Sequence, residues 1–212
     1  MAKLHVRHGS MNSSKSANLL TAAFGYEERG QRVKLIKPGT DTKGGDRLIS
    51  RIGLSRKVDV VLGPEDSPWV ALEPDGGAPV ACLFVDEAQF LTPLQVEDLF
   101  MITVEANVPV MAYGLRTDFR TEPFPGATRL LALAHSIEEI KTICRCGSKA
   151  MFNARFVDGV IAVEGPQVAV DGANTREAYE ALCGRCYITA LKLEGLPLPL
   201  GTGSRRLAGA VI

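Results

Sequence analysis

Gly9-Ser10-Met11-Asn12-Ser13-Ser14-Lys15-Ser16 is the stretch of sequence that decides the fold. It lies between a strand-like run at residues 4–7 and a helical pattern that starts at residue 17. It nearly fits the pattern G-x-x-x-x-G-K-[ST], in which the N–H groups of a tight turn and of a helix N-terminus point at phosphate oxygens. The stretch therefore predicts a phosphate-binding loop, with Lys15 on the β- and γ-phosphates and Ser16 on Mg²⁺.

Ser14 is the one departure, because the pattern has glycine at this position. A left-handed backbone costs a residue other than glycine about 1–2 kcal/mol. Two interpretations stay open: Ser14 has an ordinary backbone conformation, or its surroundings hold it in a strained one. A strand-to-helix turn that binds no phosphate is the alternative for the whole stretch, so a second motif is needed.

Residues 80–85 supply that motif, as a continuous apolar run of the length typical of a strand buried on both faces of a parallel sheet. The run ends at Asp86-Glu87-Ala88-Gln89. An acidic residue at such a strand end can hold the Mg²⁺ that the loop hydroxyl also binds, which predicts this role for Asp86. Acidic residues end many strands, but a phosphate loop on the neighbouring strand favours a joint nucleotide site.

Glu87 is the strongest candidate for a general base, because it follows Asp86 directly and the histidines of the chain are scattered. Gln89 and Phe90 could contact an acceptor by hydrogen bonding and stacking, although Phe90 could equally belong to the core. Phe119 and Phe124 pose the same choice, since aromatic residues on a polar loop suit either a planar base or a core.

The order of the apolar patterns predicts an α/β fold with a parallel sheet. Between the patterns, residues 37–57 are polar and glycine-rich, which predicts a long loop without regular structure. The expected strands cover residues 4–8, 32–36, 58–62, 80–85, 108–113 and 137–143, and the expected helices cover residues 16–29, 93–107 and 127–134.

Composition limits the classes of partner. Lys+Arg and Asp+Glu both number 24 in 212 residues, so the formal net charge is zero, whereas nucleic-acid binders are usually strongly basic. The N-terminal residues leave no room for a secretory signal, and no apolar run approaches the roughly 20 residues needed to span a membrane. We therefore expect a cytoplasmic protein that binds neither nucleic acid nor membrane.

Four of the five cysteines form two close pairs, Cys144 with Cys146 and Cys183 with Cys186. In a reducing compartment such pairs indicate a metal before a disulfide, and four thiolates make a closed tetrahedral site typical of structural Zn²⁺. Cys82 lies inside an apolar strand and is interpreted as a small buried hydrophobic residue.

A hairpin is predicted between the two pairs, because residues 151–156 and 160–163 alternate around Asp158-Gly159. Its core is too small to hold together without a metal. The predicted organisation is a P-loop nucleotide-binding domain over residues 1–143, a zinc-binding lid over residues 144–193 and a mobile tail over residues 194–212.

In this order the motifs resemble those of the type II thymidine kinases, over residues 3–192. The matching residues are the phosphate loop, Asp86-Glu87-Ala88-Gln89-Phe90, Tyr113-Gly-Leu-Arg-Thr-Asp-Phe119 with Pro123-Phe124, and the cysteine pairs with Tyr179 four residues before Cys183. The resemblance implies a RecA-like P-loop domain with a zinc-bearing lid, usually in a homotetramer. It also implies transfer of the γ-phosphoryl group of ATP to the 5′-hydroxyl of thymidine, a salvage step in DNA precursor synthesis that dTTP inhibits.

The resemblance further implies roles for single residues. Glu87 would take the proton of the 5′-hydroxyl, and Asn153 stands where the family often has a small hydroxyl residue. ATP and Mg²⁺ would contact Gly9, Ser10, Met11, Asn12, Ser13, Ser14, Lys15, Ser16, Asp86, Glu87, Ala88 and Gln89. Thymidine would contact Met11, Leu115, Phe119, Phe124, Val170, Asp171, Gly172 and Tyr179.

Two alternatives stay open. A zinc-ribbon P-loop module could bind ATP and regulate a partner without kinase activity, but binding of nucleic acid would need a basic face that the neutral composition does not indicate. A degenerate kinase, in which Ser14 prevents productive ATP binding, would keep only a structural or regulatory role.

Overall fold

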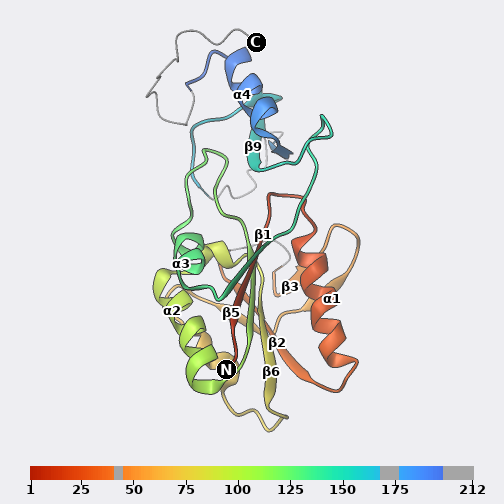
Figure 1. Cartoon of the computed structure of the whole chain (residues 1–212), viewed down its shortest axis with the longest axis vertical. Coiled ribbons are helices and arrows are strands. Elements are labelled where there is room, and N and C mark those ends of the chain that lie inside the picture. Colours follow the sequence, from red (N-terminus) through yellow and green to blue (C-terminus); the bar gives the residue numbers. More distant parts are fainter. Residues whose placement is uncertain (41–44, 168–176, 198–212) are drawn as a thin grey trace.

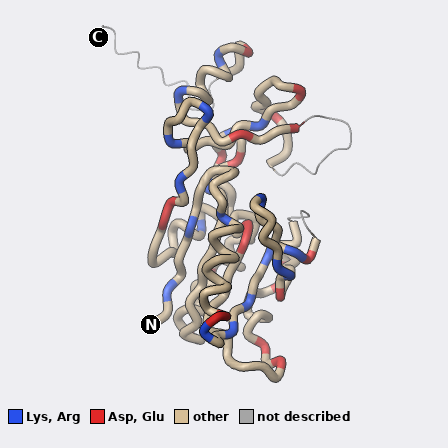
Figure 2. Tube along the Cα trace, turned by 90° about the vertical axis from the view of Figure 1, so that its right-hand side faces the viewer, with Lys and Arg blue, Asp and Glu red and all other residues tan. Residues whose placement is uncertain are grey.

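The computed structural model of the protein describes residues 1–40, 45–167 and 177–197. The molecule is elongated, with a large sheet and its helices at one end and a smaller module at the other (Figure 1). In the described residues, no helix has the length and apolar character that crossing a bilayer requires. Basic and acidic residues are interspersed over both ends of the described chain (Figure 2).

Six parallel strands form the large sheet, so the predicted α/β fold is confirmed. Their bounds are β1 (Leu4–His8), β2 (Arg32–Pro38), β5 (Val60–Leu62), β6 (Val80–Val85), β7 (Val110–Gly114) and β8 (Ser136–Glu139). The order is β5-β2-β6-β7-β1-β8, and every neighbouring pair is parallel. The expectation that the phosphate loop and the acidic motif follow neighbouring strands is wrong, because β7 lies between β1 and β6.

Helices cover both faces of this sheet (Figure 1). On one face, α1 (Lys15–Glu27) packs Leu19 and Ala23 against β2, β6 and β7. On the other face, α2 (Pro93–Met101) and α3 (Pro125–Leu133) pack Leu99 and Leu130 against the sheet. Coverage from both sides explains why the last four residues of β6 are fully buried, as the apolar run predicted.

Three segments differ from the sequence-based expectations. Residues 37–57 contain a hairpin of β3 (Arg47–Ile49) and β4 (Ser55–Lys57), and a 3-10 helix η1 (Pro68–Leu72) follows β5. The helix expected over residues 93–107 changes to a π-helical turn, η3 (Ile102–Ala106), which ends at the left-handed Asn107. Three-residue strands carry too little alternation to be detected in a sequence, which explains the missed hairpin.

The smaller module contains β9 (Phe152–Val157), β10 (Val160–Ile161), β11 (Glu177–Leu182) and α4 (Gly184–Leu193). The three strands are antiparallel in the order β10-β9-β11, and the predicted hairpin is confirmed, with positive φ at Asp158 and Gly159. The module has an apolar cluster of its own, which includes Ala154, Leu182 and Tyr187. The division of the chain into domains remains a prediction.

Gly126 gives a test of how tightly the helices hold the segment that follows β6. A Cβ at Gly126 would lie 2.3 Å from the Leu91 carbonyl oxygen and 2.8 Å from the Gln89 carbonyl oxygen, which are backbone atoms that cannot swing aside. We expect Gly126→Ala to lower the free energy of unfolding by about 1–3 kcal/mol, as overpacking does.

The matched control is Gly25 in α1, where the nearest atom to an added Cβ is Arg29 Nη1 at 3.9 Å. Gly25→Ala should raise the free energy of unfolding by about 0.5–1 kcal/mol through helix propensity alone. Urea unfolding of both variants measures the difference. Equal stabilisation by the two substitutions would contradict the packing described.

Candidate active site

The Gly9 to Ser16 loop turns the chain from β1 into α1 at the carboxyl edge of the sheet. The Lys15 ammonium folds back over the turn and donates hydrogen bonds to the carbonyl oxygens of Gly9 at 3.2 Å and Ser10 at 3.0 Å. Burial lowers the pKa of Lys15, and the nearby charges of Glu87 and Asp86 oppose that shift. A buried ammonium held over a helix N-terminus is suited to bind phosphate.

Ser14 adopts a left-handed conformation, with φ 61° and ψ 28°. Of the two interpretations that the sequence left open, the strained one is therefore correct. Ser14 is also the N-cap of α1, but its side chain accepts no capping hydrogen bond there. The first-turn N–H groups of α1 thus have no side-chain cap, which leaves them available to an anion.

Asp86 meets Ser16 across the sheet. The Ser16 hydroxyl donates a 3.1 Å hydrogen bond to Asp86 Oδ2, while Asp86 Oδ1 is buried without a partner. Burial, and then the charge of Glu87, raises the pKa of Asp86 to about 7. A hydroxyl and a carboxylate with an unpaired oxygen are ligands that suit Mg²⁺, and a cation here would offset both effects.

Glu87 also has a left-handed backbone, with φ 47° and ψ 38°. Gln89 holds its carboxylate by donating a 2.6 Å hydrogen bond from Nε2 to Glu87 Oε2, and Gln89 Oε1 accepts from the Leu115 N–H at 3.0 Å. Gln89 is buried in this bridge and Ala88 lies in the core, so both side chains pack inside the fold, and their contacts with ATP stay predictions. The left-handed backbone of Glu87 is strained, and such strain persists where the surrounding structure fixes the backbone.

Leu115, Phe119 and Phe124 belong to one loop after β7. Phe119 is buried beneath the guanidinium groups of Arg155 and Arg120, whose carbon atoms lie 5.2 and 5.6 Å from the ring centre. The smaller module holds the loop, because the Tyr187 hydroxyl donates a 2.7 Å hydrogen bond to the Phe119 carbonyl oxygen. The sequence did not predict this role of Tyr187, because the hydrogen bond joins two residues that lie far apart in the chain.

Phe124 is also buried, edge-on to Phe90 with ring centres 5.4 Å apart. Arg155 was missed as well, since an arginine in an alternating strand is normally exposed. It is buried and pairs with Glu177 at 2.5 Å, and within the described residues its Nε and Nη1 atoms have no hydrogen-bond partner. Tyr179 pairs with Arg155 across β11 and β9. The predicted thymidine contacts Val170, Asp171 and Gly172 lie outside the described residues.

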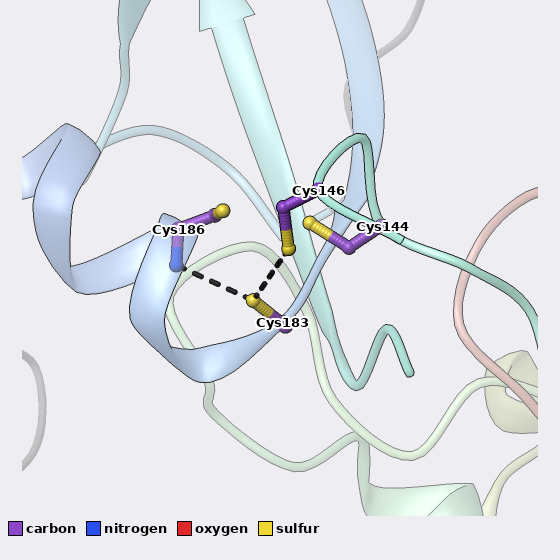
Figure 3. A group of neighbouring side chains, drawn as sticks. All are labelled: Cys144, Cys146, Cys183 and Cys186. Carbon is purple, nitrogen blue, oxygen red and sulfur yellow. Dashed lines mark hydrogen bonds between the residues drawn. The ribbon is translucent and has the colours of Figure 1, made fainter. Parts of the chain in front are cut away.

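The four paired cysteines come together in the smaller module, between a turn at Cys144 and the start of α4 (Figure 3). All four sulfur atoms lie within 4.8 Å of one another, and the Sγ atoms of Cys146 and Cys183 are 3.6 Å apart. Four sulfurs around Zn²⁺ at about 2.3 Å would be about 3.8 Å apart. The cysteines are therefore placed to bind a metal ion.

The thiols show why a cation suits this cluster. Hydrogen bonds from Ser148 lower the pKa of Cys146 to about 6, which favours a thiolate. Hydrogen bonding with Cys146 and then Cys144 raises the pKa of Cys186 to about 12. Four crowded sulfurs cannot all ionise without a positive charge among them, and a bound divalent cation supplies it.

Comparisons with known proteins agree with this geometry. The sequence model of the family described as thymidine kinase matches residues 2–187. A thymidine kinase from Coxiella burnetii is 45% identical over 194 residues, which cover 88% of this chain and 95% of the relative. Thymidine kinases from Ruegeria pomeroyi and Enterobacteria phage T4 are 43% and 41% identical, over 86% of this chain and 92% and 94% of those proteins. The chain belongs to the thymidine kinase family.

Membership of the thymidine kinase family makes the protein a kinase. The resemblance inferred from the motifs is confirmed, and the alternative of a regulatory module without kinase activity gains no support. Kinase chemistry is mainly positioning and charge stabilisation, and the groups around Lys15 and Asp86 are of the kind that provide both.

Ser14 gives a test of the strained loop. We expect Ser14→Gly to raise the free energy of unfolding by about 0.5–1 kcal/mol, because glycine adopts φ near 60° without the steric penalty. Ser13→Gly is the control, since Ser13 is buried and is not among the residues with positive φ. Thermal or urea unfolding measures both. Destabilisation by Ser14→Gly would contradict the strain assigned to this position.

Proposed function

We propose that the protein transfers the γ-phosphoryl group of ATP to the 5′-hydroxyl of thymidine. The observation that carries the proposal is the meeting of the Ser16 hydroxyl with Asp86, beside Lys15 and Glu87, in a chain of the thymidine kinase family. Two segments far apart in the sequence, the start of α1 and the residues that follow β6, supply these groups, and together they would provide a phosphate site, metal ligands and a base.

The phosphate loop would bind the donor. The N–H groups at the start of α1 and the Lys15 ammonium would face the β- and γ-phosphates, which requires Lys15 to exchange its carbonyl partners for phosphate oxygens. Ser16 and Asp86 would hold Mg²⁺, which when bound neutralises charge that develops on the phosphates. The Ser16 hydroxyl could keep donating its proton to Asp86 while the lone pairs of its oxygen bind the ion.

Glu87 would act as the general base that takes the proton of the 5′-hydroxyl. Its Oε2 is fixed by Gln89, which leaves Oε1 as the oxygen that faces the acceptor. Gln89 also accepts a hydrogen bond from the Leu115 N–H, and Leu115 is the first residue of the loop after β7, which we call the nucleoside loop (residues 115–124). The same side chain therefore holds both the catalytic base Glu87 and the start of the nucleoside loop. Gln89 thus orients both groups instead of contacting ATP through its side chain.

Thymidine would bind beside the loop that follows β7, with Met11, Leu115, Phe119, Phe124 and Tyr179 around the base. Support comes from the position of this loop between Gln89 and the smaller module. Phe119 and Phe124 are buried, so we expect thymidine either to contact the edges of their rings or to displace the rings when it binds.

We propose Zn²⁺ as the metal of the cysteine cluster and a lid role for residues 144–193. The donor set, four sulfurs with two close pairs, favours zinc over the harder divalent cations. Assembly as a homotetramer, inhibition by dTTP and a cytoplasmic location are supported by the family resemblance alone. Size-exclusion chromatography with light scattering, and assays with added dTTP, would test the first two.

Glu87→Gln should abolish most turnover while ATP binding persists. The amide has the same shape but cannot accept the proton, so we expect kcat with thymidine to fall by about 10²–10⁴-fold. Glu105→Gln serves as the control, because Glu105 is an exposed acidic residue of η3. A phosphoryl-transfer assay with MgATP and a panel of deoxynucleosides measures kcat and KM. Parental turnover in Glu87→Gln would remove Glu87 as the base.

Cys146→Ser should remove the metal. We expect about one zinc per chain in the parent and a large loss in the variant, with a melting temperature lower by roughly 5–15 °C. The KM for thymidine should rise more than the KM for ATP, because the module holds the Phe119 loop. Elemental analysis and differential scanning calorimetry measure these changes, with Cys82→Ala as the control for zinc content. Unchanged zinc content in Cys146→Ser would contradict the assignment.

A further inference from the structure

Asn153 joins the smaller module to two loops at the edge of the large sheet, the Gly9 to Ser16 loop and the loop after β7. It lies on β9 of the smaller module, and its carboxamide makes both of its hydrogen bonds to backbone atoms outside that module. Oδ1 accepts from the Met11 N–H at 2.7 Å, and Nδ2 donates to the Thr117 carbonyl oxygen at 2.9 Å. The residue is only 4% exposed, so water cannot easily replace either partner.

We propose that Asn153 is a positioning residue that fixes the phosphate loop against the nucleoside loop, and so sets how donor and acceptor meet. The inference rests on the proposed function. Met11 lies in the middle of the phosphate loop, and Thr117 lies between Leu115 and Phe119 in the loop after β7. One planar group that holds both backbones constrains their separation, and a misplacement of about 1 Å can cost a kinase much of its rate.

The nucleoside loop is stiff enough to transmit this constraint. Thr117 pairs with Pro123 in an antiparallel bridge, and the Asp118 carboxylate accepts from the N–H groups of Arg120 and Glu122. A loop closed on itself moves as one unit. Anchoring its Thr117 carbonyl therefore also places the Leu115 and Phe119 side chains.

The contact is not needed to attach the module to the sheet domain. Tyr187 donates to the Phe119 carbonyl oxygen, and Arg155 lies over the Phe119 ring, independently of Asn153. Variants at Asn153 should therefore fold, with their main defect in the relation between the two loops.

Two substitutions separate the two hydrogen bonds. Asn153→Asp keeps an acceptor for the Met11 N–H but places a carboxylate oxygen against the Thr117 carbonyl oxygen. Asn153→Leu has a similar size and makes neither bond. We expect about a tenfold rise in the KM for thymidine in both variants, and about a tenfold rise in the dissociation constant of a non-hydrolysable ATP analogue in Asn153→Leu alone.

The pH dependence of Asn153→Asp gives a readout that a packing defect would not produce. A buried carboxyl facing a carbonyl oxygen is favoured in its protonated form, which again donates to Thr117. We therefore expect the ratio of kcat/KM for variant and parent to rise as pH falls. His8 on β1, Glu139 on β8 and Arg116 face the same small cavity. Both proteins contain these groups, so a change in the ratio reports the new carboxyl together with its effect on them.

The experiment measures thymidine kinetics from pH 6 to 9 and ATP-analogue binding for the parent, both variants and Asn107→Asp. Asn107 is exposed and accepts from the Ala2 N–H before the start of β1, whereas the site follows the end of β1, so Asn107→Asp should give a flat ratio near one. Circular dichroism confirms folding. A parent that phosphorylates no thymidine refutes the proposed function, and the analogue-binding difference then still tests Asn153. Parental analogue binding in Asn153→Leu, or a pH-independent ratio for Asn153→Asp, overturns the role of Asn153.

Discussion

The hydrogen bond between Ser16 and Asp86 is the contact on which the rest of the arrangement depends. It joins the start of α1 to the end of β6 across the intervening β7, and it brings a buried ammonium within reach of two carboxylates. Burying charged groups costs free energy, and the same burial raises the pKa of Asp86. A bound cation would offset the negative charges of Asp86 and Glu87, and a triphosphate would offset the positive charge of Lys15. The site is therefore arranged for a ligand more than for stability.

Part of the backbone strain lies at the same place. Six described residues other than glycine have positive φ, and three of them, Asn12, Ser14 and Glu87, lie in the loops that carry Lys15 and Glu87. The smaller module contacts the Gly9 to Ser16 loop through Asn153 on Met11, and it contacts the loop after β7 through Tyr187 on Phe119. A metal ion bound by the four cysteines would act at a distance, because it would make rigid the module that contacts both loops.

Local patterns predicted much of this structure, and their limits are physical. The turn between β1 and α1, the buried β6 and the grouping of the cysteine pairs follow from short-range rules of periodicity and spacing, and each is found, whereas phosphate binding by the turn stays a prediction. The β3–β4 hairpin was missed because its strands are too short to show alternation. The position of β7 and the roles of Asn153 and Arg155 depend on contacts between distant segments, which no single stretch of sequence encodes. The sequence could not decide whether the Ser14 backbone is strained or relaxed, because the answer depends on the backbone that surrounds it.

The most direct test of the account is a crystal structure with Mg²⁺, thymidine and a non-hydrolysable ATP analogue. The account predicts the γ-phosphate on the N–H groups around Lys15, the ion on Ser16 and Asp86, and a Glu87 oxygen about 2.6–3.2 Å from the 5′-oxygen of thymidine. A triphosphate bound away from the Lys15 turn, or a 5′-oxygen remote from Glu87, would contradict it.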